Sequence, residues 1–334
     1  MGRKFTRHSL YIIGFSVTVS LMFFNIETAK VFPYEYPTPT PRPEYLNPGE
    51  TDSLAVIDGG NGWTSLISTL EDYPPDWHVE SYALDCSDGQ WVMGDWDGDG
   101  RESLGGYGYS TFFFTNLQKT VGQCRDWSRL WIGPQGQPVA GHFRADLAHD
   151  CIGIVEQLQK DGHTTFVLWY TCDLATTAPE IHFQILGELL PKLAGYSGFP
   201  QFVAGDWDGD GVETLAVRRG GFVTYTNTPP TDPNPVFTDA QAIGLPYDDE
   251  YEYGVFVAGD WDDDGIDSFG FYYFFLTYQL GADRVNRYFT HHEFYYCTQL
   301  ICLADGYQFV RMNLPLGSPW AKRPINAVSW RYKP

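Results

Sequence analysis

The sequence predicts an all-β protein, most simply a five-bladed β-propeller over residues 52–334. An acidic, glycine-containing loop occurs three times in register, at Val92–Gly100, Val203–Gly211 and Val257–Gly265. A short apolar stretch precedes each copy and a strand-like stretch follows it. With a degenerate fourth copy at Val139–Asp150, the glycines that enter the loops are 47, 64 and 54 residues apart, a period typical of propeller blades. Aromatic residues make up 17% of the chain, with 35 glycines and 22 prolines, a composition that favours short strands joined by tight turns.

Residues 1–30 have the pattern of an export signal. Three basic residues precede the apolar run Leu10–Phe24, as in a secretory signal peptide. Ala29 is a candidate for the residue before a cleavage site, but Glu27 then stands where a second small residue is preferred. An uncleaved signal anchor, which would tether the chain to a membrane, is the alternative. Both interpretations predict a secreted or cell-surface protein.

Residues 31–51 are predicted to form a stalk. Proline occupies every second position from Pro37 to Pro43, which neither a helix interior nor a sheet interior tolerates. Such a segment favours polyproline II, a semi-rigid spacer. The propeller domain is therefore expected to begin at about residue 52.

The chain contains six cysteines. An even number in an exported chain indicates disulfide bonds, although sequence alone does not select the connectivity. Pairing of nearest neighbours would give Cys86–Cys124, Cys151–Cys172 and Cys297–Cys302.

The formal net charge is −21. A surface this acidic repels the phosphates of nucleic acids and anionic lipid headgroups, which argues against a nucleic-acid partner. It suits a protein that holds cations.

The three acidic loops are predicted calcium sites. Counted from the first aspartate, each has aspartate at positions 1, 3 and 5 and glycine at position 6. Calcium takes six to eight oxygen ligands, and the backbone carbonyl of position 7 and either the acid at position 8 or the hydroxyl at position 9 would complete the shell. Three carboxylates on five residues repel one another unless a cation lies between them. Magnesium, which demands strict octahedral geometry, is disfavoured. The predicted ligands are Asp95, Asp97, Asp99, Arg101, Glu102 and Ser103; Asp206, Asp208, Asp210, Val212, Glu213 and Thr214; and Asp260, Asp262, Asp264, Ile266, Asp267 and Ser268.

A fourth copy, at Val139–Asp150, is degenerate. His142 and Arg144 occupy positions 1 and 3, with Asp146 at position 5 and Asp150 at position 9. A guanidinium beside the two acids can act as an internal cation, so no metal is expected there. Position 2 is aromatic in all four copies and is expected to pack between neighbouring sheets. These residues are Trp96, Phe143, Trp207 and Trp261.

Strand-like stretches starting at residues 53, 103, 151, 214 and 268 give the count of five units, with six blades as the alternative. The C-terminal stretch Arg323–Tyr332 resembles the apolar strand before each loop and is expected to be the last strand of unit five. The acidic loops, which join consecutive blades or strands, should lie on one rim. Within the repeat region, Glu180–Gly195 is the segment closest to a helical pattern and is expected to hold at most a short helix.

The three GDWDGDG-like loops resemble the FG-GAP/VCBS-type repeats, which also occur in the integrin α-subunit head. The resemblance covers most of the chain after the stalk. It implies a calcium-loop propeller that serves as an extracellular adhesion or ligand-binding module, in some cases attached to an enzyme. The better-known members have seven blades, for which this chain is too short. They also commonly have an acid at loop position 9, where this chain has a hydroxyl.

We therefore expect a non-catalytic, calcium-stabilised surface module that binds a protein or glycan partner. The alternatives are a polysaccharide-active hydrolase or lyase built on the propeller, and a purely structural envelope component. The sequence has no G-x-S-x-G, P-loop or H-E-x-x-H motif. The acidic run Asp248–Glu252 and the cluster His291–Glu293 are weak candidates for catalytic or metal-binding groups. The aromatic run Tyr272–Phe275 is expected to be a buried strand rather than a sugar-stacking surface.

Overall fold

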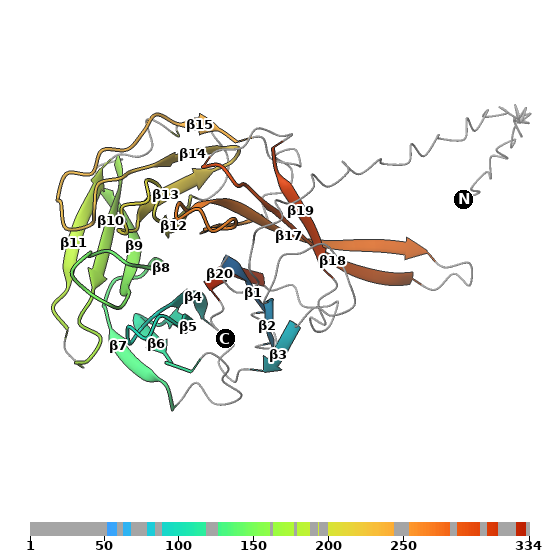
Figure 1. Ribbon diagram of the computed structural model, residues 1–334, viewed down its shortest axis with the longest axis horizontal. Helices are drawn as coiled ribbons and strands as arrows, with labels where there is room; N and C mark the ends of the chain where they lie inside the picture. Colours follow the sequence, from blue (N-terminus) through green and yellow to red (C-terminus); the bar gives the residue numbers. More distant parts are fainter. Residues whose placement is uncertain are drawn as a thin grey trace, which may run out of the picture. The chain divides into compact units, whose positions relative to one another are not determined.

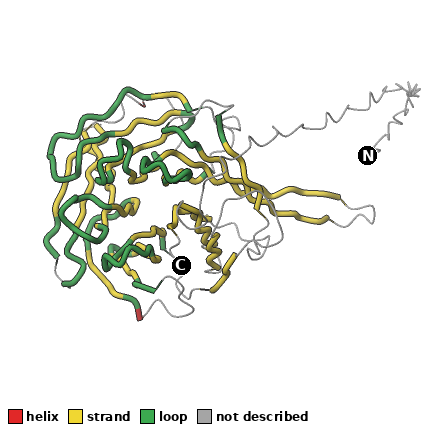
Figure 2. The backbone as a smooth tube through the Cα atoms, viewed as in Figure 1, coloured by secondary structure: helices red, strands yellow, loops and turns green. Residues whose placement is uncertain are grey.

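The structure of the chain is a computed structural model. It describes residues 52–58, 63–67, 79–83, 89–117, 126–160, 163–176, 179–187, 193, 200–243, 254–280, 286–300, 306–312 and 325–331. These residues are almost entirely strands and loops (Figure 2). None of the helical residues among them belongs to a helix long and apolar enough to cross a membrane. The predicted signal segment and stalk lie outside the described residues.

The described strands form five four-stranded antiparallel sheets (Figure 1). In four of these sheets the strands follow one another in sequence. The first contains β4 (Gln90–Gly94), β5 (Ser103–Gly108), β6 (Thr111–Phe114) and β7 (Ser128–Trp131). The second contains β8 (Gln137–Gly141), β9 (Cys151–Lys160), β10 (His163–Thr171) and β11 (His182–Gly187).

The next two sheets repeat this order. One contains β12 (Gln201–Gly205), β13 (Thr214–Arg219), β14 (Phe222–Tyr225) and β15 (Gln241–Ala242). The other contains β16 (Val255–Gly259), β17 (Ser268–Leu280), β18 (Asn286–Tyr296) and β19 (Gln308–Met312). Within the segment 180–195, which has the pattern closest to a helix, residues 182–187 pair with β10 as strand β11.

The remaining sheet joins the two ends of the described chain. Its order is β20 (Ile325–Arg331), β1 (Asp52–Asp58), β2 (Trp63–Ile67) and β3 (Val79–Ala83). The C-terminal strand was expected to be the last strand of unit five, but it pairs with β1 from Asp52↔Arg331 to Asp58↔Ile325. In the other sheets, the apolar strand before a loop pairs with the strand after it, as β4 pairs with β5. β20 pairs with β1 in the same way, so β20 is the equivalent of β4 in this sheet.

The fold is a β-propeller. The first strands of the five sheets contact one another in a closed order. It runs from β20 through β4, β8, β12 and β16 back to β20. The other strands of each sheet extend outward from this set in order. The acidic loops follow the ends of β4, β12 and β16, so they share the end of the propeller at which these strands finish.

The aromatic residue at loop position 2 packs between sheets, as predicted. Trp96 is 4% exposed and lies in one core cluster with Ile152 and Ile154 of the next sheet. Trp207 likewise packs against Phe269, with ring centroids 4.9 Å apart. The glycine before the first and second acidic loops leaves room for the position-2 tryptophan, whose ring folds back over it. A Cβ atom at Gly94 would lie 2.6 Å from the Trp96 ring, and one at Gly205 would lie 2.5 Å from the Trp207 ring.

Candidate functional site

The three acidic loops connect the first and second strands of their sheets, β4 to β5, β12 to β13 and β16 to β17. Their backbones share one conformation. Positions 4 and 6 have positive φ in every loop, with values of 76° and 80° at Gly98 and Gly100, 74° and 81° at Gly209 and Gly211, and 59° and 83° at Asp263 and Gly265. Glycine adopts this region at little cost, which explains why position 6 is always glycine. Position 4 is glycine in the first two loops but Asp263 in the third, where a residue with a side chain adopts positive φ.

The aspartate at position 1 organises each loop. In the first loop the Asp95 carboxylate accepts backbone N–H groups from Gly98 at 2.8 Å, Asp99 at 3.2 Å and Gly100 at 2.7 Å. The second loop repeats these bonds to Asp206 at 2.8, 3.1 and 2.8 Å. In the third, Asp260 accepts from positions 5 and 6 at 3.1 and 3.0 Å. The carboxylate at position 5 accepts the N–H of position 7 in every copy.

This backbone brings the three aspartates of each loop together. In each triad one carboxylate oxygen per residue lies within 4.8 Å of the other two, and the three triads are Asp95, Asp97 and Asp99; Asp206, Asp208 and Asp210; and Asp260, Asp262 and Asp264. Such oxygens can converge on one cation.

Burial, together with the proximity of these charges, raises the pKa of one aspartate in each triad. Burial, followed by the neighbouring Asp264 and Asp260 charges, raises the pKa of Asp262 to about 6. The pKa of Asp208 is raised by burial and by Asp210 and Asp206. Burial also raises the pKa of Asp95. A bound cation would favour the ionised carboxylates instead.

The hydroxyl at position 9 lies away from the triads. It begins the second strand and is buried, with 1%, 3% and 4% exposure for Ser103, Thr214 and Ser268. Each hydroxyl donates to a backbone carbonyl at the end of the third strand or just after it, on Thr115, Thr226 and Cys297 respectively. The hydroxyl therefore joins two strands of its own sheet.

The acid at position 8 reaches the neighbouring sheet. The backbone N–H of Asp267 donates to the Asp206 carbonyl at 2.8 Å, and the Asp267 carboxylate accepts the Asp206 N–H at 2.8 Å. Similarly, the N–H of Glu213 donates to the carbonyl of His142 at 3.0 Å. Sequence reasoning assigned position 8 or 9 to the metal shell of its own loop and missed this link. The available signal was an acid directly before the second strand in every copy.

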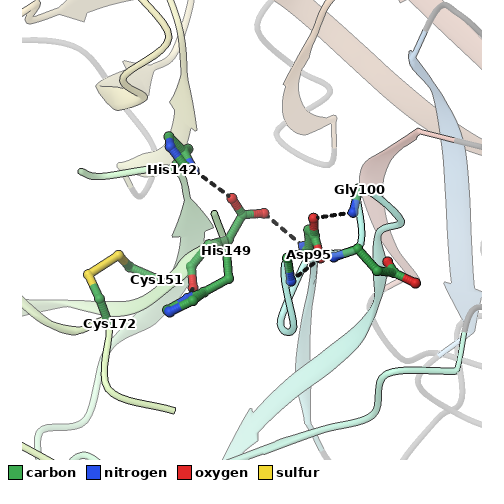
Figure 3. A network of polar contacts seen from close by, with 9 residues as sticks. Asp95, Gly100, His142, His149, Cys151 and Cys172 are labelled. Carbon is green, nitrogen blue, oxygen red and sulfur yellow. Dashed lines mark hydrogen bonds and ion pairs between the residues drawn. A yellow bond between two sulfur atoms is a disulfide. The ribbon is translucent and has the colours of Figure 1, made fainter. Parts of the chain in front are cut away.

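The degenerate loop joins β8 to β9 and keeps the hydrogen-bonded link to the neighbouring sheet, but the acid that makes this link is one position later in the sequence count. Asp150 is the last residue before β9, and it exchanges two 2.8 Å hydrogen bonds with the main chain of Asp95 (Figure 3). It therefore corresponds to position 8 of the other loops, and its assignment to position 9 is corrected. The loop has one residue more than the intact copies.

Arg144 pairs with one of the two predicted acids. Its Nε and Nη2 atoms lie 2.9 and 2.7 Å from the two carboxylate oxygens of Asp146, a two-point pair. Asp150 instead has His142 Nδ1 at 3.5 Å from its Oδ1 atom, and the hydrogen bond to Asp150 raises the pKa of His142 (Figure 3). None of residues 142–150, all of which the structure describes, has positive φ. The degenerate loop thus differs from the others in backbone as well as in side chains.

A disulfide occupies the position of the strand-linking hydroxyl in this sheet. Cys151 begins β9, as Ser103 begins β5, and it is bonded to Cys172 just after β10 (Figure 3). Thr171 pairs with Ile152, which places Cys172 opposite Cys151. This predicted pair is confirmed. Cys297 is also disulfide-bonded, while Cys86, Cys124 and Cys302 lie outside the described residues.

A cavity of about 260 Å³ lies where four inner strands end. Met93, Ala140, Ala204 and Ala258, the penultimate residues of β4, β8, β12 and β16, form part of its lining. Acidic residues from the adjoining loops also line it, so the cavity favours cations and disfavours anions. The acidic residues of the lining are Glu102, Asp150, Asp206, Glu213, Asp260 and Asp267. His142 also lines the cavity.

The weaker candidates from the sequence do not form a site among the described residues. Glu293 is 2% exposed and accepts a hydrogen bond from the Tyr295 hydroxyl at 3.0 Å. Tyr272 and Tyr273 are 1% and 3% exposed, as expected for a buried strand. The side chains of Phe274, Phe275, His291 and His292, and the whole run Asp248–Glu252, lie outside the described residues.

No protein-family model matches the chain, and no curated protein matches it. Among solved structures, the fold is similar to that of a lectin from Agrocybe aegerita that recognises non-reducing terminal N-acetylglucosamine, with a TM-score of 0.39 and 8% identity. The similarity covers 84% of this chain and 95% of that chain.

Proposed function

We propose that the protein is a non-catalytic recognition module whose propeller is stabilised by calcium at three loops. The observation that carries the metal assignment is the convergence of three carboxylates in each loop, within 4.8 Å of one another. Such a donor set fits a hard cation that prefers oxygen ligands. The raised pKa of Asp262 agrees with this inference, because it reflects burial of the carboxylate and its proximity to Asp264 and Asp260.

The aspartates at positions 1, 3 and 5 would bind the ion through their side chains, and position 7 would contribute its carbonyl, as in other calcium loops built on alternating residues. The acid at position 8 would act between sheets instead. Calcium would then lower the repulsion inside each loop, and the loops would in turn hold neighbouring sheets together through links such as Asp267 to Asp206.

We also propose that the five sheets are the five blades of a closed ring, and that the protein works outside the cytoplasm, secreted or tethered through its N-terminal segment. The apolar run after a basic flank supports export. The disulfide between Cys151 and Cys172 agrees with an oxidising compartment. The D-x-D-x-D-G loops support a relationship to the FG-GAP/VCBS-type repeats. The partner would be a protein or a glycan.

Metal binding is tested on the full-length chain by metal analysis and thermal melting with calcium, with magnesium and with EDTA. We expect about three calcium ions per chain and a lower melting temperature in EDTA, because an ion present at 100 times its Kd stabilises the folded state by about 2.7 kcal/mol per site. The triple variant Asp206→Asn, Asp208→Asn and Asp210→Asn should lose one ion.

The matched control carries the same charge change at three exposed aspartates outside the loops, Asp126→Asn, Asp173→Asn and Asp232→Asn. It should keep all three ions. A chain that melts at the same temperature with calcium and with EDTA would refute the metal proposal.

Recognition and catalysis are separated by two screens. A glycan and surface-protein binding screen should give a calcium-dependent partner. A turnover screen on polysaccharides should give no product. Hydrolysis would need two carboxylates about 5–9 Å apart beside the substrate. Product that is still formed by the purified chain would favour the hydrolase or lyase alternative.

A further inference from the structure

Two large aromatic side chains stay exposed at one end of the sheet that contains β4 to β7. Tyr109 is 88% exposed and Trp131 is 65% exposed. Tyr109 lies in the turn between β5 and β6, and Trp131 is the last residue of β7. Thr111 at the start of β6 pairs directly with Trp131. The backbone N–H of Ile132 donates to the Ser110 carbonyl at 3.3 Å, so the turn and the end of β7 are joined.

The neighbouring backbone fixes the position of Trp131. Gly133 has a φ of 96°, and a Cβ atom there would lie 3.1 to 3.6 Å from three atoms of the indole ring. The ring therefore lies against Gly133, at a place where a larger residue would displace it. The following loop is anchored to the sheet, because the Tyr107 hydroxyl donates to the Pro134 carbonyl. The indole is thus exposed and held in place, which lowers the entropy cost of binding.

The turn that carries Tyr109 has an unusual composition. Gly108 pairs with Thr111, which leaves a two-residue hairpin turn with φ of 53° at Tyr109 and 60° at Ser110. Asparagine and glycine are the residues preferred in such turns. A tyrosine in this position costs conformational free energy and its ring gains little burial in return. Packing within the chain therefore does not account for it.

We propose that Tyr109 and Trp131 form a stacking platform for a neutral pyranose ring of a glycan. This inference rests on the proposed recognition function and specifies its ligand class. The face of an aromatic ring carries negative charge density, and the C–H groups on one face of a sugar carry partial positive charge, so the two pack favourably. The hydroxyls of Ser110 and Thr111 lie beside the rings in sequence and can bond to sugar hydroxyls.

The size and charge of the surface favour a sugar over a protein or an anion. The other large apolar residues that are exposed in the described part of the chain lie on different elements, such as Phe183 and Ile185 on β11. A stable protein interface buries about 800 Å² on each partner, which is far more than two rings provide. The net charge of −21 disfavours acidic glycans.

The test uses the full-length chain and four neutral probes, cellotriose, mannotriose, chitotriose and N-acetyllactosamine, with binding measured by saturation-transfer difference NMR at millimolar sugar. At least one probe should bind. Trp131→Ala and Tyr109→Ala should each weaken that binding by about two- to tenfold, the factor that one aromatic contact contributes. Trp131→Phe should retain part of it, and Gly133→Ala should weaken it by displacing the ring.

Phe183→Ala is the matched control, because it removes an aromatic ring that is 58% exposed on another sheet. It should leave binding unchanged, and all variants should melt within a few degrees of the natural chain. Absence of binding by all four sugars would overturn the inference, as would a sugar that binds both alanine variants as well as the natural chain. A protein partner found in the separate screen would then leave the proposed recognition function standing without the sugar platform.

Discussion

Asp267 and Asp206 hold each other across two sheets through a reciprocal pair of hydrogen bonds. Each main-chain N–H donates at 2.8 Å, from Asp267 to the Asp206 carbonyl and from Asp206 to the Asp267 carboxylate. Asp150 and Asp95 form the same pair between another two sheets, although Asp150 belongs to the degenerate loop. The link between sheets therefore does not require an intact acidic loop on both sides.

Asp267→Ala should destabilise the propeller more than Asp267→Asn. The alanine variant leaves the Asp206 N–H without its acceptor, which costs about 1–3 kcal/mol when the group is buried, whereas asparagine retains an oxygen that can accept it. In EDTA, thermal melting should show a fall of several degrees for the alanine variant, at about 2–4 °C for each kcal/mol in a chain of this size. Asp150→Ala should behave alike. Equal melting of the alanine variant and the natural chain would mean that the pair contributes nothing.

The metal-free third loop should become less stable as the pH rises. Its Asp262 has a pKa of about 6, raised from 3.8 by burial and by Asp264 and Asp260. A folded chain that holds the proton more tightly than the unfolded chain gains stability below the unfolded pKa and loses it as the pH rises through the folded pKa. Stability in EDTA should therefore fall between about pH 4 and pH 6 through this group.

Asp262→Asn isolates that effect. At pH 7 in EDTA the variant should melt above the natural chain, because one repelling charge is gone. At pH 7 with calcium the order should reverse, because one ligand is gone as well. Melting curves under the two conditions measure both. A variant that is less stable than the natural chain in EDTA would show that the Asp262 carboxylate stabilises the loop without a metal.

The fold class and the triads could be predicted because both depend on local sequence. Alternate aspartates and a glycine at position 6 are enough to predict a tight acidic turn, and Trp96 at position 2 is recognisable as a core residue. The pairing of β20 with β1 depends on a partner strand about 270 residues away in sequence, for which no local pattern exists. The same holds for Asp267, whose contact lies on another sheet.

The register of the degenerate loop was hidden by its extra residue. Counting from His142 placed Asp150 at position 9, whereas its contacts match those of position 8. The strand starts alone aligned Cys151 with Ser103, Thr214 and Ser268, but they did not show that these residues share a role. Only the three-dimensional positions show that the disulfide of one sheet and the hydroxyl-to-carbonyl hydrogen bond of three others both join the second strand to the end of the third.

Loss of the Cys151–Cys172 disulfide should destabilise the chain, and a restored hydroxyl should recover part of the loss. The bond closes a segment with a sequence separation of 21 residues, for which chain-entropy arguments give about 3 kcal/mol. Cys151→Ser with Cys172→Thr recreates the residue types found at Ser103 and Thr115, whose hydrogen bond would return about 1 kcal/mol. Cys151→Ala with Cys172→Ala should therefore melt lower than the serine and threonine variant. Identical melting of the two double variants would refute the equivalence.

Restoring a metal to the degenerate loop should require its backbone as well as its carboxylates. His142→Asp with Arg144→Asp supplies three acids at positions 1, 3 and 5, but positions 4 and 6 remain Ala145 and Leu147, which do not have positive φ. This double variant should bind no additional calcium. Replacing residues 142–150 by the sequence Asp206–Glu213 supplies both glycines, removes the extra residue and keeps an acid before β9. Metal analysis should then find one more calcium ion per chain. A gain already present in the double variant would show that the carboxylates alone define the site, because the main chain would have adjusted to them.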